Sequence, residues 1–207
     1  MRLTGSGEDL LHRAASSLGH DSLDPAVVAR AWRRVLDRSS SAEELAKGRD
    51  LSGARHREVW TALYAAAGLE ELAPGLGTAL YELTVRADSW EAFPDSLPTL
   101  RAVRDRGLRT GIVSDTGFDL RPALDRLGLS AYVDTVLMSY ELGICKPDPE
   151  VFRTACARLG VEPPDTLMVG DNPLTDSGAV VAGIPVLLLP PPPPNGPRGL
   201  GRVLSLL

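Results

Sequence analysis

Two aspartates with the spacing of a metal site lie near the C-terminal end of the chain. Asp171 and Asp176 are five residues apart in VGDNPLTDSGAVVAG, directly after a short apolar run. Two carboxylates this close repel one another unless a positive charge lies near them. Mg²⁺ is a hard cation that prefers carboxylate oxygens. The pattern predicts a metal site at Asp171 and Asp176, although Asp176 could instead be a charge at a helix N-terminus.

Three further polar residues follow apolar segments earlier in the chain. Ser114 and Asp115 end GIVSD, and Lys146 lies in the loop CKPDPE. A hydroxyl and an ammonium can hold a phosphate group, and a metal ion can bridge to its oxygens. Charge neutralisation and positioning of this kind are what phosphoryl transfer requires. Singly, each residue could equally be a turn, a cap or a solvated loop residue.

The use of lysine adds weight to Lys146. Of the 22 basic residues, 20 are arginine, and the two lysines are Lys47 and Lys146. Arginine and lysine are not interchangeable, because a lysine carries a compact ammonium and an arginine carries a planar guanidinium. A lysine kept in an arginine-rich chain therefore indicates a function that needs an ammonium.

The elements that must position these residues differ between the two halves of the chain. Residues 8–88 read as helices, with Asp24 and Pro25 as the start of one helix and Ser41 with Glu44 as a capping box of another. From Phe93 onward, short apolar strands alternate with helices. Such alternation predicts right-handed crossovers and a Rossmann-like parallel sheet flanked by helices, in the α/β class.

In an open parallel sheet, ligands bind at the carboxyl ends of the strands. We therefore expect the polar residues after the three strands to converge on one crevice. We divide the chain into a helical, cap-like region at residues 1–89, a Rossmann-like core at 90–190 and a proline-rich tail at 191–207. Pro190 to Pro194 cannot donate ladder hydrogen bonds, so the last strand must stop at about Leu189, and the stretch is expected to be a stiff linker.

Composition excludes several function classes. The net charge of −5 and the pI of about 5.2 argue against a nucleic-acid-binding face. The longest apolar run is too short to span a bilayer, and the N-terminus does not resemble a signal peptide. Two cysteines do not make a disulfide framework. We expect a cytoplasmic protein without membrane or nucleic-acid partners, and the sequence leaves its oligomeric state open.

The order of these motifs resembles the haloacid dehalogenase-like hydrolase superfamily. GIVSDTGFD is similar to its second motif, CKPDPEVF to its third and GDNPLTD to its fourth, and the likeness extends over residues 90–190. The resemblance implies that Lys146 and Ser114 are catalytic, that Ser114, Asp115 and Lys146 bind phosphate, and that Asp171 and Asp176 support Mg²⁺. The helical region resembles the family's cap, which covers the site and selects substrate.

The family's first motif, an apolar strand ending in Asp-x-Asp, has no match in the 207 residues. In the family its first aspartate is the nucleophile, and its strand lies in the middle of the sheet, between the strands ending at Ser114 and Asp171. Loss of that strand leaves backbone groups unpaired in a buried slot. Three explanations stay open: further residues upstream, a degenerate homologue that binds without turnover, or another segment or chain that fills the slot.

The resemblance implies a Mg²⁺-dependent phosphatase of a small phosphorylated metabolite. One alternative is a catalytically inactive binding or regulatory protein. A second is a 2-haloacid dehalogenase, which needs no metal and for which Asp171 and Asp176 would have no purpose. The sequence does not name the substrate. We expect the histidines and tryptophans to pack or face solvent rather than bind ligands: His12, His20, His56, Trp32, Trp60 and Trp90.

Overall fold

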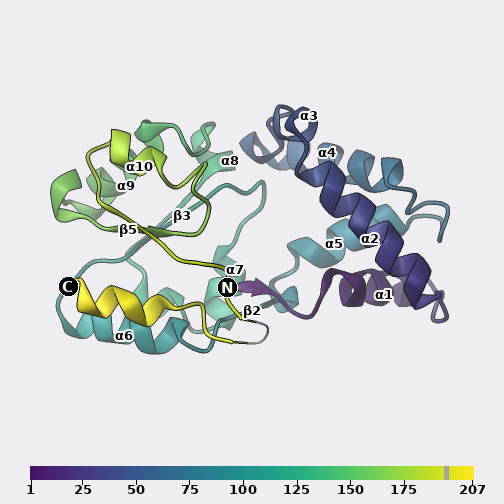
Figure 1. The fold of residues 1–207 in the computed structure, drawn as a ribbon, viewed down its shortest axis with the longest axis horizontal. Coiled ribbons are helices and arrows are strands. Elements are labelled where there is room, and N and C mark those ends of the chain that lie inside the picture. The colour runs from purple at the N-terminus through teal and green to yellow at the C-terminus, as the bar shows by residue number, and fades with distance from the viewer. Residues whose placement is uncertain (194–195) are drawn as a thin grey trace.

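The computed structural model describes residues 1–193 and 196–207. Pro194, part of the expected polyproline stretch, lies outside the described residues. The chain forms a helical lobe from its N-terminal part and an α/β lobe from the rest (Figure 1). A short antiparallel pair joins the lobes: β1 (Arg2–Leu3) lies beside β2 (Trp90–Glu91). The first residues therefore lie at the junction of the two lobes.

Five helices build the N-terminal lobe: α1 (Gly7–Ser17), α2 (Pro25–Ser39), α3 (Ala42–Leu45), α4 (Gly53–Ala66) and α5 (Leu76–Val85), with short 3₁₀ turns η1 (Arg49–Leu51) and η2 (Ala87–Ser89). As predicted, Asp24 caps α2 and Pro25 is its first residue. Ser41 accepts the backbone N–H of Glu44, but the predicted capping box is not complete, because the Glu44 side chain accepts from Lys47 instead of the Ser41 backbone. The sequence reading missed a complete capping box at the start of α1, formed by Ser6 and Asp9.

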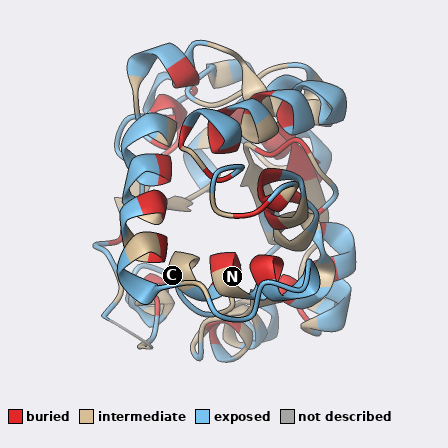
Figure 2. Cartoon of the chain, turned by 90° about the vertical axis from the view of Figure 1, so that its right-hand side faces the viewer, coloured by how far each residue is buried: buried red, intermediate tan, exposed pale blue. Residues whose placement is uncertain are grey.

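The helical lobe has one apolar interior, which we call the cap cluster. It contains buried side chains from four helices and the loop after α4, among them Leu11, Val35, Leu63 and Leu80. Apolar residues at helical spacing place such side chains on one face of each helix. Figure 2 shows these buried faces turned inward, with exposed residues outside.

The α/β lobe holds two parallel strand pairs. β3 (Gly111–Ser114) pairs with β4 (Thr135–Met138), and β5 (Met168–Gly170) pairs with β6 (Val186–Leu188). Helices α6 (Ser96–Asp105) and α9 (Pro149–Leu159) lie on opposite sides of the strands (Figure 1). The remaining helices are α7 (Arg121–Arg126), α8 (Ser139–Leu142) and α10 (Gly178–Val181), with η3 (Ser130–Tyr132) and η4 (Pro163–Asp165). Parallel strands flanked by helices confirm the predicted α/β class.

The two pairs are not joined in one sheet. Among the described residues, β3 and β5 belong to separate two-stranded sheets, so each has a neighbour on one side only. All of β5 and most of β3 are partly exposed, whereas strands of a parallel sheet are normally covered on both faces. In the sheet that the resemblance implies, the family's first strand would lie between β3 and β5. We call that position the slot.

The last residues form a separate strap across the α/β lobe. After β6 the chain turns back, and the 3₁₀ segment η5 (Leu200–Ser205) runs beside α6 (Figure 1). The last strand ends at Leu188, one residue before the expected limit, because prolines follow from Pro190. No helix in the described part of the chain is both long and apolar enough to cross a membrane.

Candidate active site at the carboxyl ends of the strands

A buried ion pair lies at the centre of the predicted site. Lys146 Nζ is 2.6 Å from Asp176 Oδ1, and Asp176 is 1% exposed. The other oxygen, Oδ2, accepts the backbone N–H groups of Asp171 at 2.8 Å and Asn172 at 3.0 Å. Burial raises the pKa of Asp176, but the Lys146 ammonium and the backbone donors outweigh it, so the pKa is lowered. Asp176 is therefore ionised and holds the Lys146 ammonium in place.

Asp115 ties the end of β3 to the same loop. Its Oδ1 accepts the backbone N–H of Lys146 at 3.0 Å. Burial raises its pKa, the nearby Asp176 charge raises it further, and Lys146 lowers it. Both carboxylates thus bind Lys146, Asp115 at its backbone N–H and Asp176 at its ammonium. An anion entering here would find the Lys146 ammonium as its counter-charge.

Ser114 is the last residue of β3, opposite Met138 in β4. Its side chain is partly exposed and makes no hydrogen bond within the described residues, which leaves its hydroxyl able to donate to a ligand. The structure brings Asp115, Lys146 and Asp176 together through recorded hydrogen bonds, whereas Ser114 is linked to them only as the chain neighbour of Asp115. The phosphate-binding and catalytic roles of Ser114 remain predictions.

Asp171 stands apart from that group. Its backbone N–H binds Asp176, but its side chain is 67% exposed and its Oδ2 lies 3.1 Å from Arg198 Nη2. Both oxygens of Asp176 are already hydrogen-bonded. In this arrangement Asp171 fits a direct metal ligand, and Asp176 fits a residue that holds the loop and Lys146. No three His, Cys, Asp or Glu side chains in residues 1–193 and 196–207 lie close enough to form a metal site by themselves.

The helical lobe reaches the site through one contact region. Ser139 Oγ donates to the carbonyl of Asp50 at 2.7 Å and accepts the N–H of Thr116 at 2.9 Å. Gly117 lies against His56, since a Cβ on Gly117 would stand 2.1 Å from the Cβ of His56. Burial raises the pKa of Asp50; the Arg49 guanidinium lowers it and the Asp115 charge raises it, so the net shift is upward. The pKa of Asp50 therefore depends in part on the charge of Asp115 at the end of β3.

Sequence reasoning missed Asp50, Ser139 and Arg198. None of them lies in a recognisable motif, and Arg198 is far along the chain from the residues it contacts. His56 is buried, and its Nδ1 lies 3.0 Å from the hydroxyl of Tyr81, in agreement with the expected packing role. The contacts of Asp50, Ser139 and Arg198 depend on how the lobes and the strap fold together, and no local sequence pattern predicts that.

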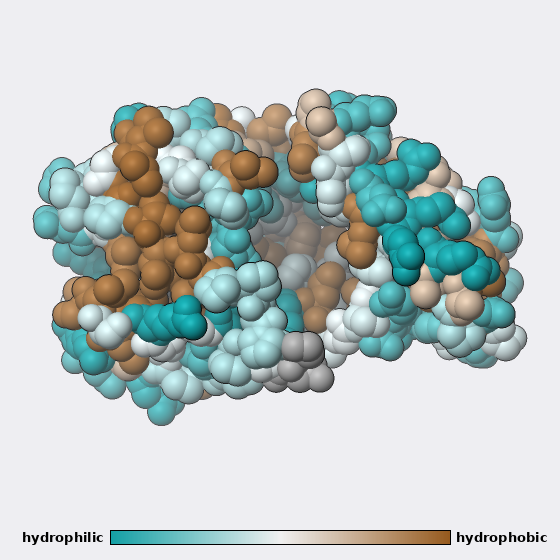
Figure 3. Space-filling view, viewed as in Figure 1, coloured by the Kyte–Doolittle hydropathy of each residue, from teal (hydrophilic) through white to brown (hydrophobic). Residues whose placement is uncertain are grey.

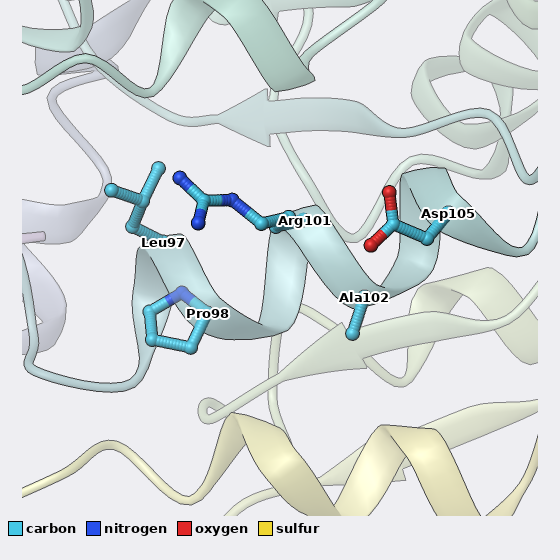
Figure 4. A pocket seen from close by; sticks show the side chains of 5 residues that line it. All are labelled: Leu97, Pro98, Arg101, Ala102 and Asp105. Atoms are coloured by element: carbon cyan, nitrogen blue, oxygen red, sulfur yellow. The ribbon is translucent and has the colours of Figure 1, made fainter.

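Two cavities lie in the α/β lobe, and one of them includes a candidate site residue. One of about 400 Å³ lies at the end of β5 beside Asp171 and Arg198; its other lining residues include Met1, Arg2, Phe93 and Val169. The space-filling view shows the surface hollowed between the lobes (Figure 3). The other, of about 270 Å³, is lined by α6 alone and has no polar group from a second element (Figure 4). Only the first is connected with the candidate site.

A family model described as haloacid dehalogenase-like hydrolase matches residues 11–183. The chain belongs to this family. The match includes most of the helical lobe and every candidate site residue. The family membership inferred from the second, third and fourth motifs is thereby confirmed, as is the fold that the resemblance implied.

Among curated relatives, phosphoserine phosphatase of Thermus thermophilus is 38% identical over 132 residues, 63% of this chain and 52% of the relative. A plasmid-encoded phosphoglycolate phosphatase of Cupriavidus necator is 36% identical over 112 residues, 53% of this chain and 48% of the relative. The chain thus matches about half the length of these relatives. Both relatives are phosphatases of small metabolites.

The fold is also similar to a crystal structure titled as a dehalogenase with an intermediate complex. That comparison has a TM-score of 0.66 and 23% identity, and it covers 99% of this chain and 92% of the other. At this level of identity the likeness shows the fold alone. The fold alone does not separate phosphatase from dehalogenase chemistry.

Proposed function

We propose that this chain forms the phosphate- and Mg²⁺-binding part of a hydrolase that removes phosphate from a small phosphorylated metabolite. One observation carries the proposal: the Lys146 ammonium is held by buried Asp176 at the carboxyl ends of the strands. A fixed ammonium favours a phosphoryl group over a neutral substrate. The phosphatase activities of the relatives support the same substrate class.

Each residue has a separate task in this proposal. Lys146 neutralises the transferring phosphoryl group and the attacking carboxylate, and Ser114 donates to a phosphate oxygen. Asp171 presents its exposed carboxylate to the metal, which when bound would neutralise charge on the phosphoryl oxygens. Asp176 fixes Lys146, and Asp115 fixes the backbone of the same loop. Asp50 and the residues around it stand where a cap would contact the rest of the substrate.

The attacking carboxylate is the part that the sequence does not supply in an Asp-x-Asp motif. The slot between β3 and β5 has unpaired edges on both sides, and Met1 lines the cavity at the end of β5. We infer that a parallel apolar strand in the slot would satisfy those edges and deliver a carboxylate opposite Lys146. The same open slot favours the second candidate, a protein that binds phosphate without turnover.

A matched set of proteins tests the proposal. The chain is compared with a version that carries, before Met1, a six-residue apolar strand ending in Asp-x-Asp. Phosphate release is measured with Mg²⁺ on phosphoserine, phosphoglycolate and glyceraldehyde 3-phosphate. We expect release near background from the chain alone and turnover from the extended version. Lys146→Ala in the extended version should reduce turnover about a hundredfold.

The control is Lys47→Ala, since Lys47 is the other lysine and pairs with Glu44 away from the site. It should leave turnover unchanged. A folded extended version that releases no phosphate from any substrate would favour the binding protein. Turnover by the chain alone that is lost in Lys146→Ala would show that no added strand is needed.

A further inference from the structure

The strap that ends the chain places a buried cation on the predicted metal ligand. Arg198 is 9% exposed, and its Nη2 lies 3.1 Å from Asp171 Oδ2. The same guanidinium donates to the carbonyls of Leu189 and Pro190. Neither carbonyl carries a full charge, so Asp171 is the carboxylate that directly balances this guanidinium.

The backbone of the strap is held by a different carboxylate. The N–H groups of Arg198, Gly199 and Leu200 each donate to Asp95 at 2.8 Å. Burial raises the pKa of Asp95, but the three backbone donors outweigh it, so the pKa is lowered. Gly199 has φ of +90°, a left-handed conformation that suits glycine. Asp95 therefore holds the backbone of Arg198 in position, and Asp171 holds its guanidinium.

Arg198 and Asp171 also line the same cavity of about 400 Å³ at the end of β5. A hydrated cation that approaches Asp171 from this cavity meets the guanidinium there. Asp176 is a poorer ligand for that cation, because it is 1% exposed and already accepts three hydrogen bonds from Lys146 and the backbone of its own loop. Any metal at this site therefore depends on the carboxylate that Arg198 already occupies.

We propose that Arg198 and a divalent cation compete for Asp171, so that the strap weakens metal binding and metal binding loosens the strap. The inference rests on the proposed role of Asp171 as metal ligand. Two cations on one carboxylate repel each other, and a buried guanidinium that loses its counter-charge is destabilised. Because coupling between two binding events is reciprocal, each effect requires the other.

The first test measures Mg²⁺ affinity of the full chain by titration calorimetry. Arg198→Gln removes the competing charge, and we expect it to bind Mg²⁺ about tenfold more tightly. Asp95→Ala frees the strap and leaves the guanidinium intact, and it should also tighten binding. Arg202→Gln is the matched control, because Arg202 is exposed on the same strap and no ion pair is recorded for it within the described residues. It should change nothing.

If Arg198 instead positioned Asp171 for the metal, Arg198→Gln would weaken Mg²⁺ binding. Weaker or unchanged affinity in both Arg198→Gln and Asp95→Ala overturns the competition. The use of Asp95→Ala keeps the test decisive if Arg198→Gln does not fold.

The second test follows hydrogen exchange in residues 196–207. Saturating Mg²⁺ should accelerate exchange there in the unmodified chain. Asp171→Ala should exchange fast already without Mg²⁺ and should not respond to it. Mg²⁺ binding with unchanged exchange in the strap overturns the proposal. If Asp171→Ala loosens the strap but no protein binds Mg²⁺, the metal role of Asp171 in the proposed function fails, and the competition fails with it.

Discussion

Lys146 and Asp176 show how a site residue can also be part of the interior. Asp176 is nearly inaccessible to solvent, and its two oxygens together accept three hydrogen bonds, one of them from Lys146. Breaking a buried ion pair by removing one partner costs about 3 kcal/mol or more, because the other charge stays buried. The pair therefore links charge at the site with stability of the loop that carries it. Loss of Lys146 would affect both.

His56 gives the chain an acid-sensitive contact between its lobes. Burial, assisted by the Arg49 guanidinium, lowers its pKa from 6.5 to about 4. At neutral pH His56 is uncharged, so its 3.6 Å approach to Asp50 is not an ion pair. The unfolded chain takes up the proton first as the pH falls. Stability from this residue is thus complete above pH 6.5 and is lost between 6.5 and 4.

From these values we expect the free energy of unfolding to drop by about 2 kcal/mol between pH 7 and pH 4.5 through His56 alone. Urea denaturation at both pH values measures the drop. His56→Gln should remove that component, and His20→Gln, at an exposed position, should not. An equal pH dependence in His56→Gln would show that other groups cause the acid sensitivity.

At the scale of elements, a close approach joins α10 to the loop of Lys146. A Cβ on Gly178, the first residue of α10, would lie 2.2 Å from the carbonyl oxygen of Pro147. No residue larger than glycine fits there without moving backbone. Gly178 therefore sets the distance between α10 and the loop that carries Lys146.

We expect Gly178→Ala to lower the free energy of unfolding by about 2 kcal/mol, in the range of other overpacked sites. Urea denaturation monitored by circular dichroism measures the change. Gly201→Ala is the control, since a Cβ there meets nothing within 4 Å. A loss below 0.5 kcal/mol in Gly178→Ala would mean that the loop yields easily, and the argument for a fixed spacing would fail.

At the scale of the whole molecule, the two lobes have separate apolar interiors. The cap cluster contains Leu63, with Trp32 and Trp60 packed against it. A smaller core cluster in the α/β lobe contains Phe152, Cys156, Ala179, Ala182 and Ile184. The cap cluster lies wholly before residue 90 and the smaller cluster wholly after it, so we expect each to be able to lose its packing without the other.

We expect two separate unfolding transitions in urea. Leu63→Ala should shift the transition seen by tryptophan fluorescence by 2 kcal/mol or more, as for other large-to-small changes in a core. Circular dichroism follows the helices of both lobes and should show both transitions. Phe152→Ala should shift the one that fluorescence does not report and leave the fluorescence transition in place. Coincident transitions that move together in both variants would show one cooperative unit.

The sequence by itself determined the order of the elements and the identity of the polar residues at the strand ends. Alternating apolar strands and helices and the cap at Asp24 are local patterns, and each is found where it was expected. Such signals survive in isolation because hydrogen bonding and hydrophobic spacing act over a few residues. They also pointed to the family that the comparison then established.

Only the tertiary structure decided which cation each of the two aspartates contacts. The spacing treated Asp171 and Asp176 as one pair, whereas folding buries Asp176 against Lys146 and leaves Asp171 to Arg198. It also brings Asp50 to Ser139 and leaves β3 and β5 with free edges. The physical reason is that charge pairing and burial depend on neighbours from distant parts of the chain, and no local pattern of residue types records those neighbours.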